Sequence, residues 1–243
     1  MPERPYTILS CSISLDGYLG GATRERLVLS NDADLCRVDR VRSECDAILV
    51  GAGTVRDDNP RLLVRDPALR ERRRARGMAE SPTKVTMTRQ ARLDADSNFF
   101  ATGTSEKIVY CATPSLPTAR SRLAHVATVV DGGPDVEVAR LSADLHDRGV
   151  RRLMVEGGGR VHTQFLTSAA ADELHLVVAP FFVGSSQARR FVGDGAFPWN
   201  PGHRARLAQT QQIGDVVLLR YALSPRFEDT VEDTAEDTVE DAG

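Results

Sequence analysis

Lysine and cysteine are scarce in this 243-residue chain. Only two of its 31 basic residues are lysines, Lys84 and Lys107, which leaves little room for Schiff-base chemistry on a lysine. The four cysteines form no CxxC pair, so neither a zinc ribbon nor a thioredoxin-type site is supported. We therefore expect reduced, packed cysteines in a cytoplasmic protein.

Long apolar runs, aromatics and metal-binding spacings are also missing. No run approaches the roughly 18 apolar residues of a membrane helix, and the polar start MPERPYT is unlike a signal peptide. Aromatic residues make up 5% of the chain and do not interleave with the basic runs, which argues against nucleic-acid binding. The five histidines show no HxxxH or HxE spacing, so we expect no metal site.

Charge is distributed unevenly along the chain. Residues 228–243 contain eight of the 34 acidic residues and no base, so residues 1–227 hold 31 bases against 26 acids. The composition of this repetitive segment predicts an acidic disordered tail, either a solubilising extension or an interaction tail. Residues 1–227 are expected to form one domain, whose net charge of +5 suits the binding of phosphorylated ligands.

Short apolar runs alternate with helical stretches, a pattern typical of an α/β domain with a mostly parallel central sheet flanked by helices. A helix capped by Ser30 or Asn31 is expected to end near Glu44, and the Arg-rich residues 65–76 are expected to form an exposed helical excursion. An Ile213-Gly214 turn predicts a C-terminal antiparallel hairpin. Strands are expected at 6–15, 46–50, 84–88, 107–111, 126–130, 152–155 and 173–179, and further helices at 114–123 and 137–148.

Glycines directly follow the strand that ends at Val50. Gly51 and Gly53 allow a ligand to approach the backbone closely, as phosphates require. A dinucleotide-binding fingerprint needs a third glycine where this chain has Arg56, and Pro60 with the preceding polar residues favours a loop over a long helix. A standard Rossmann site is therefore not expected.

A second glycine turn follows the strand that contains Val155. Gly157, Gly158 and Gly159 precede a helical segment, so free N–H groups are expected to point at one anion, such as a pyrophosphate. Either turn alone could be a tight turn without a ligand, but two at strand ends favour a nucleotide site. His162 is expected to be a surface or packing residue, and Asp16 to cap a turn.

Four motifs in order resemble the reductases of riboflavin biosynthesis, namely the C-terminal domain of the bacterial deaminase–reductase and the stand-alone archaeal and fungal enzymes. They are SLDG (14–17), DAILVGAGTVRDDNPRL (46–62), VEGGGRVHTQFL (155–166) and DELHLVVAPFFVG (172–184). The resemblance implies a dihydrofolate-reductase-like fold, a homodimer, NADPH as cofactor and a phosphoribosylamino-pyrimidine substrate. No HxE or PCxxC motif of the deaminase is present, so we expect reduction alone.

The same resemblance implies the cofactor contacts. Arg89 would suit a 2′-phosphate, because a guanidinium gives bidentate, charge-assisted hydrogen bonds. The cofactor-binding residues it implies are Gly51, Gly53, Thr54, Val55, Thr86, Thr88, Arg89, Gly157, Gly158 and Gly159.

The substrate site follows from the resemblance too. Asp58 is the expected proton donor, with a nearby water as the alternative, and Glu156 would hydrogen-bond the pyrimidine. Asn59, Arg61 and Arg65 match the substrate loop.

Two departures leave the exact substrate open. Ser10 stands where the family usually has Lys or Asn, and Asn59 replaces a second acidic residue of bacterial members. The alternatives are a reductase of another pterin-like or secondary-metabolite substrate and a non-catalytic NADP-binding protein.

Overall fold

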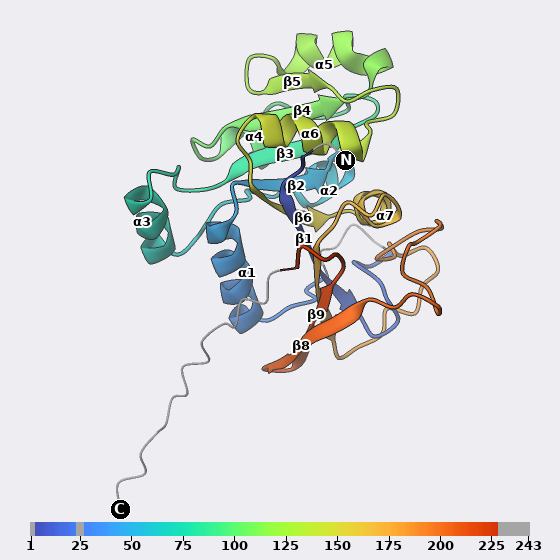
Figure 1. Ribbon diagram of the computed structural model, residues 1–243. Helices are drawn as coiled ribbons and strands as arrows, with labels where there is room; N and C mark the ends of the chain where they lie inside the picture. The colour runs from blue at the N-terminus through green and yellow to red at the C-terminus, as the bar shows by residue number, and fades with distance from the viewer. Residues whose placement is uncertain (1–2, 23–26, 228–243) are drawn as a thin grey trace, which may run out of the picture.

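A single nine-stranded sheet runs through the protein, with helices on both faces (Figure 1). The computed structural model describes residues 3–22 and 27–227. The predicted acidic tail at 228–243 lies outside the described residues, so the boundary at residue 227 stays a prediction.

The first seven strands of the chain run parallel to one another, and the last two extend the sheet beyond the seventh strand with antiparallel pairing. This confirms the predicted fold class and the C-terminal hairpin. In the spatial order β5-β4-β3-β2-β6-β1-β7-β9-β8, the strands are β1 (Tyr6–Ser14), β2 (Ala47–Gly51), β3 (Thr83–Thr88), β4 (Lys107–Cys111), β5 (Thr128–Asp131), β6 (Arg152–Gly157), β7 (Glu173–Ala179), β8 (Arg206–Ile213) and β9 (Val216–Ala222).

The predicted helices are present, and two further ones, α2 (Ala52–Asp58) and α4 (Asn98–Ala101), were not predicted. Of the two predicted caps of the first helix, Ser30 and Asn31, the structure shows Asn31, whose side chain accepts a hydrogen bond from the Asp34 N–H. The helices are α1 (Asp32–Glu44), α2 (Ala52–Asp58), α3 (Pro67–Ala75), α4 (Asn98–Ala101), α5 (Leu116–Leu123), preceded by the 3₁₀ turn η1 (Thr113–Ser115), α6 (Val138–Asp147) and α7 (Gly159–Thr167).

The prediction of a loop after Val50 is wrong, because helix α2 occupies most of that segment. Pro60 does forbid a longer helix, and the chain turns at Asn59, which adopts the left-handed conformation (φ 44°). The residues before it contain no proline, and the helix buries Ala52 and Val55. The arginine-rich helix α3 is largely exposed as predicted, but it buries Leu69 and Arg73. Arg73 donates to the carbonyls of Ser43, Cys45 and Ala79.

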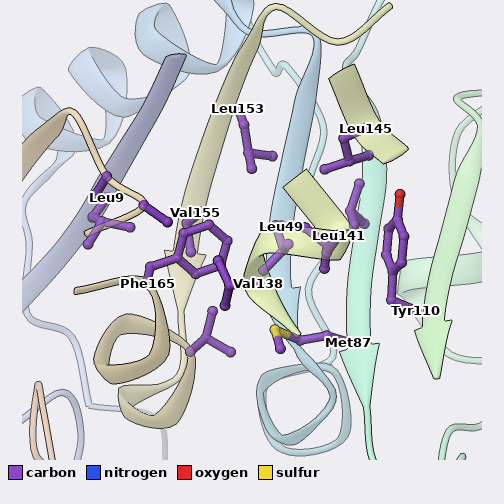
Figure 2. Close-up of a cluster of buried hydrophobic side chains, with 14 of the residues drawn as sticks. Leu9, Leu49, Met87, Tyr110, Val138, Leu141, Leu145, Leu153, Val155 and Phe165 are labelled. Atoms are coloured by element: carbon purple, nitrogen blue, oxygen red, sulfur yellow. The ribbon is translucent and has the colours of Figure 1, made fainter. Parts of the chain in front are cut away.

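Two apolar clusters, one on each face of the sheet, fix where the helices lie. Figure 2 shows the cluster on the face covered by α6 and α7, where Leu141 and Phe165 pack against Leu49 and Val155 of the central strands. On the opposite face, which carries α1, α2, α4 and α5, alternate residues of the same strands are buried, such as Ile48 and Met154. Because both faces are covered, the carboxyl edge of the parallel strands is where polar loops collect.

Candidate active site

The two glycine turns lie next to each other, because β2 and β6 are neighbouring parallel strands. Val50 is paired with Gly157 after a register shift, so the two strands end side by side. Gly51 is the N-cap of α2, and Gly158 (φ 91°) is the N-cap of α7. The first N–H groups of both helices therefore emerge at one edge of the sheet, which is an arrangement suited to anions.

Close approach requires glycine at position 51, whereas the positive φ is what favours glycine at position 158. A Cβ on Gly51 would lie 2.8 Å from Cγ2 of Val161, and one on Gly158 would lie 3.4 Å from the Thr54 hydroxyl oxygen. A Cβ on Gly157 would also contact Thr54, at 3.6 Å. Thr54 of α2 thus faces the second glycine turn, and the structure brings together the two motifs that the sequence predicts to cooperate.

Gly159 has a different reason to be glycine. A Cβ there would collide with the backbone carbonyl of Arg190, which belongs to a segment that crosses the start of α7. That segment is anchored by the Gly193 N–H, which donates to the Thr163 hydroxyl, and by an Arg189–Asp57 ion pair at 3.3 Å.

The remaining predicted cofactor residues lie in different surroundings. Gly53 and Thr54 are half-buried in α2, whereas Val55 is 1% exposed and packs into the core. At the end of β3, the Thr86 hydroxyl is buried, and it has no hydrogen-bond partner among the described residues. The Thr88 hydroxyl accepts from the Ala91 N–H.

Arg89, which follows β3, is exposed. Its Nε lies 2.5 Å from a carboxylate oxygen of Asp135, and both side chains are more than half exposed. An exposed ion pair of this kind contributes little to stability, so the guanidinium can exchange this partner for another anion at small cost.

Glu156, Ser10 and His175 form a row across three adjacent strands on the α1 face. Ser10 is paired with His175 of β7, and Ser10 and Glu156 each follow the paired residues Leu9 and Val155. Ser10 is 5% exposed and is therefore buried on this face of the sheet. The structure therefore brings the candidate substrate residues Ser10 and Glu156 side by side.

The Glu156 carboxylate is held by Arg42 of α1, a residue that the sequence analysis did not identify. Nε and Nη2 of Arg42 donate to the two carboxylate oxygens, each at 2.5 Å. Burial disfavours the charge on Arg42, but the Glu156 carboxylate outweighs this and raises the pKa of Arg42. Arg42 therefore keeps its charge, and its contact with Glu156 is a bidentate, charge-assisted ion pair.

The predicted substrate loop carries four predicted residues, and its second half contacts α1. Asp58 is exposed at the end of α2, and Asn59 Oδ1 accepts from the Asn98 N–H at 2.7 Å. Arg61 is exposed. The Asp39 carboxylate of α1 accepts from the Arg65 N–H at 2.9 Å. The half-exposed Arg65 side chain lies 3.7 Å from the same carboxylate and donates to the Leu35 carbonyl.

A buried ionic network continues the row beyond Ser10, and sequence patterns gave no sign of it. His175 Nε2 donates to Glu173 at 2.6 Å, and its Nδ1 accepts from Arg37, an arrangement that requires a neutral imidazole. Burial lowers the pKa of His175, in agreement with that tautomer. Burial alone would raise the pKa of Glu173, but hydrogen bonds from His175 and Arg220 lower it to about 2.

Other features bear on the class of protein. Asp16 accepts from the N–H groups of Val183 and Gly184, the turn-capping role expected for it. Among the described residues, no helix combines the length and apolarity needed to cross a membrane. No group of three or more His, Cys, Asp or Glu side chains within residues 3–22 and 27–227 could hold a metal ion.

Comparison with known proteins supports the sequence resemblance. The model of the RibD C-terminal domain family matches residues 5–219. The chain is 32% identical over 226 residues to the 2,5-diamino-6-ribosylamino-4(3H)-pyrimidinone 5′-phosphate reductase of Archaeoglobus fulgidus, covering 92% of this chain and 99% of that protein. It is 33% identical over 223 residues to the protein of the same name from Methanothermobacter thermautotrophicus, covering 90% and 99%.

A solved structure shows the same fold. A pyrimidine reductase-like protein from Corynebacterium diphtheriae superposes with a TM-score of 0.75 at 21% identity, over 90% of this chain and 91% of that one.

Proposed function

The chain belongs to the RibD C-terminal domain family, and from that membership we propose that it is an NADPH-dependent reductase of riboflavin biosynthesis. Its reaction would convert the ribosyl group of a 5-amino-6-(5-phosphoribosylamino)pyrimidine to a ribityl group. The observation that carries the proposal is the meeting of two glycine turns directly beside an ion-paired carboxylate, Glu156. The names of the two archaeal relatives favour the diaminopyrimidinone over the deaminated uracil as substrate.

The residues at the carboxyl edge fit a dinucleotide. Thr54 faces backbone without side chains at Gly157 and Gly158, and two helix N-termini supply N–H donors there. Gly51, Gly53, Thr54, Gly157 and Gly158 would hold the phosphates and the nicotinamide side, and Arg89 would hold a 2′-phosphate. When bound, the nicotinamide supplies a hydride from its C4 carbon.

The chain's own contribution would be to orient the substrate and to supply a proton. The Glu156 carboxylate accepts hydrogen bonds from the pyrimidine, and Arg61 and Arg65 are exposed cations for the 5′-phosphate. Asp58 is exposed at the end of α2, next to this loop, and would protonate the ribose oxygen as its ring opens.

A homodimer is part of the proposal, and an uncovered face of the sheet supports it. Ile13, Val178 and Val217 form a row across β1, β7 and β9 on the face opposite α1. Val217 is 36% exposed and the neighbouring Leu15 is 51% exposed. A second copy covering this face would bury both, so Val217→Asp is expected to shift the molecular mass in light scattering from dimer to monomer.

The direct test is NADPH oxidation by the purified protein. The diaminopyrimidinone phosphate, its deaminated uracil counterpart and dihydrofolate are compared as substrates at equal concentration. We expect turnover with the first and little with dihydrofolate. Turnover with dihydrofolate alone would favour a pterin-like substrate instead, and NADPH binding without turnover of any of the three would favour a non-catalytic protein.

A further inference from the structure

The Arg42 side chain contacts both parts of the candidate substrate site. Two of its nitrogens donate to the Glu156 carboxylate, and the third, Nη1, donates to the Leu63 carbonyl at 3.3 Å. Leu63 belongs to the predicted substrate loop, between Arg61 and Arg65. One guanidinium therefore ties a strand residue of the site to a loop residue of the site.

This contact is well shielded from water. The Arg42 side chain is 16% exposed and that of Glu156 is 13% exposed. A bidentate, charge-assisted pair with little exposure is strong and geometrically specific, because the planar guanidinium matches both carboxylate oxygens at once. A lysine could not reproduce it.

The pair fixes what Glu156 can offer to a ligand. An ionised carboxylate has about four lone-pair directions and donates nothing. Arg42 occupies one lone pair on each oxygen, so one lone pair on each oxygen remains, and these accept hydrogen bonds only. Glu156 is thereby held as an acceptor for N–H groups.

Helix α1 also holds the loop at a second point. The Asp39 carboxylate accepts from the N–H groups of Arg65 and Asp66, at 2.9 and 2.8 Å. Asp39 and Arg42 are three residues apart and so lie on adjacent positions of the helix. The loop and Glu156 therefore share one support.

We propose that Arg42 is a positioning residue, which fixes the Glu156 carboxylate as an acceptor for the pyrimidine and sets the substrate loop at a constant distance from it. The inference rests on the proposed function. The inference goes beyond the proposed function by giving a role to Arg42, a residue that need not touch the substrate.

The test is a double-mutant cycle in turnover of the diaminopyrimidinone phosphate. Arg42→Ala and Glu156→Gln are each expected to lower kcat/KM about 100-fold, because misplacement of a binding group costs about that much. The double variant is expected to lose much less than the product of the two single losses, since Arg42 acts largely through Glu156. The dissociation constant for NADPH should stay within about twofold. Arg40→Ala, on an exposed position of α1, is the matched control and should leave kcat/KM unchanged.

Chemical rescue adds a readout that a purely structural role would not move. Guanidinium ions at millimolar concentration should restore part of the kcat/KM of Arg42→Ala and none of that of Glu156→Gln. If circular dichroism shows Arg42→Ala to be unfolded, Arg42→Lys takes its place. Its kcat/KM is expected to fall about tenfold, and this loss should again be non-additive with that of Glu156→Gln.

Two kinds of result would overturn the proposal, and they are distinguishable. If the unaltered enzyme turns the substrate over but the losses from the two substitutions multiply, Arg42 does not act through Glu156. Wild-type kcat/KM in Arg42→Ala has the same meaning. If the unaltered enzyme gives no turnover, the proposed function is wrong and the role of Arg42 falls with it.

Discussion

The Thr54 side chain of α2 faces Gly158, the N-cap of α7, and a Cβ on Gly158 would lie in contact with the Thr54 hydroxyl, at 3.4 Å. Gly158 also has a φ of 91°, a conformation that other residues rarely adopt. This contact joins two glycine turns that are more than 100 residues apart in the chain. It defines the place where we propose that the cofactor phosphates bind.

Gly158→Ala should therefore weaken both folding and cofactor binding. The positive φ predicts a cost of about 1–3 kcal/mol in the free energy of unfolding, and the added methyl group narrows the gap to Thr54. We expect the NADPH dissociation constant, measured by fluorescence titration, to rise at least tenfold. Gly149→Ala is the matched control: it has the same φ of 91° with no atom within 4 Å of its Cβ. It should lose similar stability and keep its NADPH affinity, and an equal loss of affinity in both variants would contradict the site.

Glu156→Gln and Asp58→Asn should separate substrate chemistry from cofactor binding. Both remove a charge without changing shape, so kcat/KM for the pyrimidine should fall about 10²–10⁴-fold in Asp58→Asn, as for loss of a general acid. NADPH affinity should stay near the wild-type value in both. Exposed Asp96→Asn, in another loop, serves as the control for Asp58→Asn. Undiminished turnover in Asp58→Asn would transfer the proton-donor role to water.

Arg89→Ala tests the preference for NADPH over NADH. A charge-assisted contact to the 2′-phosphate is worth about 1.5–3 kcal/mol, so the KM for NADPH should rise at least tenfold while that for NADH stays constant. Removing the competing carboxylate by Asp135→Asn should strengthen NADPH binding, most clearly at low salt. The control is Arg140→Ala, another exposed arginine paired with an aspartate. An equal change for both cofactors would place the 2′-phosphate elsewhere.

His162 predicts a pH dependence of stability. It is fully buried, and neither ring nitrogen has a hydrogen-bond partner among the described residues. Burial lowers the pKa of His162 from 6.5 to about 4. Between these pH values the unfolded chain binds a proton that the folded chain does not, so stability falls as the pH drops from 6.5 to 4, by up to about 3 kcal/mol.

His162→Phe should remove this contribution and leave stability at pH 7 equal or higher, because an unpaired buried polar group is lost. Urea unfolding at pH 7 and pH 5 measures the difference, with the exposed His125→Phe as control. A stability loss on acidification that is equal in wild type and His162→Phe would show that His162 does not contribute.

Much of the fold could be predicted from the sequence, because the buried parallel strands are short apolar runs bounded by polar residues. Runs such as Ile48–Val50 and Leu153–Val155 lie in the two central strands. Helix α2 was missed because the polar residues before Pro60 are typical of a loop, whereas the burial of Ala52 and Val55 favours a helix. Tertiary packing decided that segment, and local propensity did not.

The glycine turns and Glu156 could be predicted because they follow strands directly, but Arg42 could not be identified by the same reasoning. The available signal was its spacing: Arg42 lies four residues after Val38, on the apolar side of α1. A lone arginine on such a stripe indicates a buried partner, but the partner is more than 100 residues away in the chain. The network around His175 is hidden for the same reason, since its charges come from α1, β7 and β9.

The most direct measurement of the central claim is the rate of NADPH oxidation at 340 nm with the diaminopyrimidinone ribosyl phosphate, followed by mass analysis of the product. We expect turnover, with a product two mass units heavier that carries an open-chain ribityl group. NADPH binding without consumption of this substrate would contradict the proposed function.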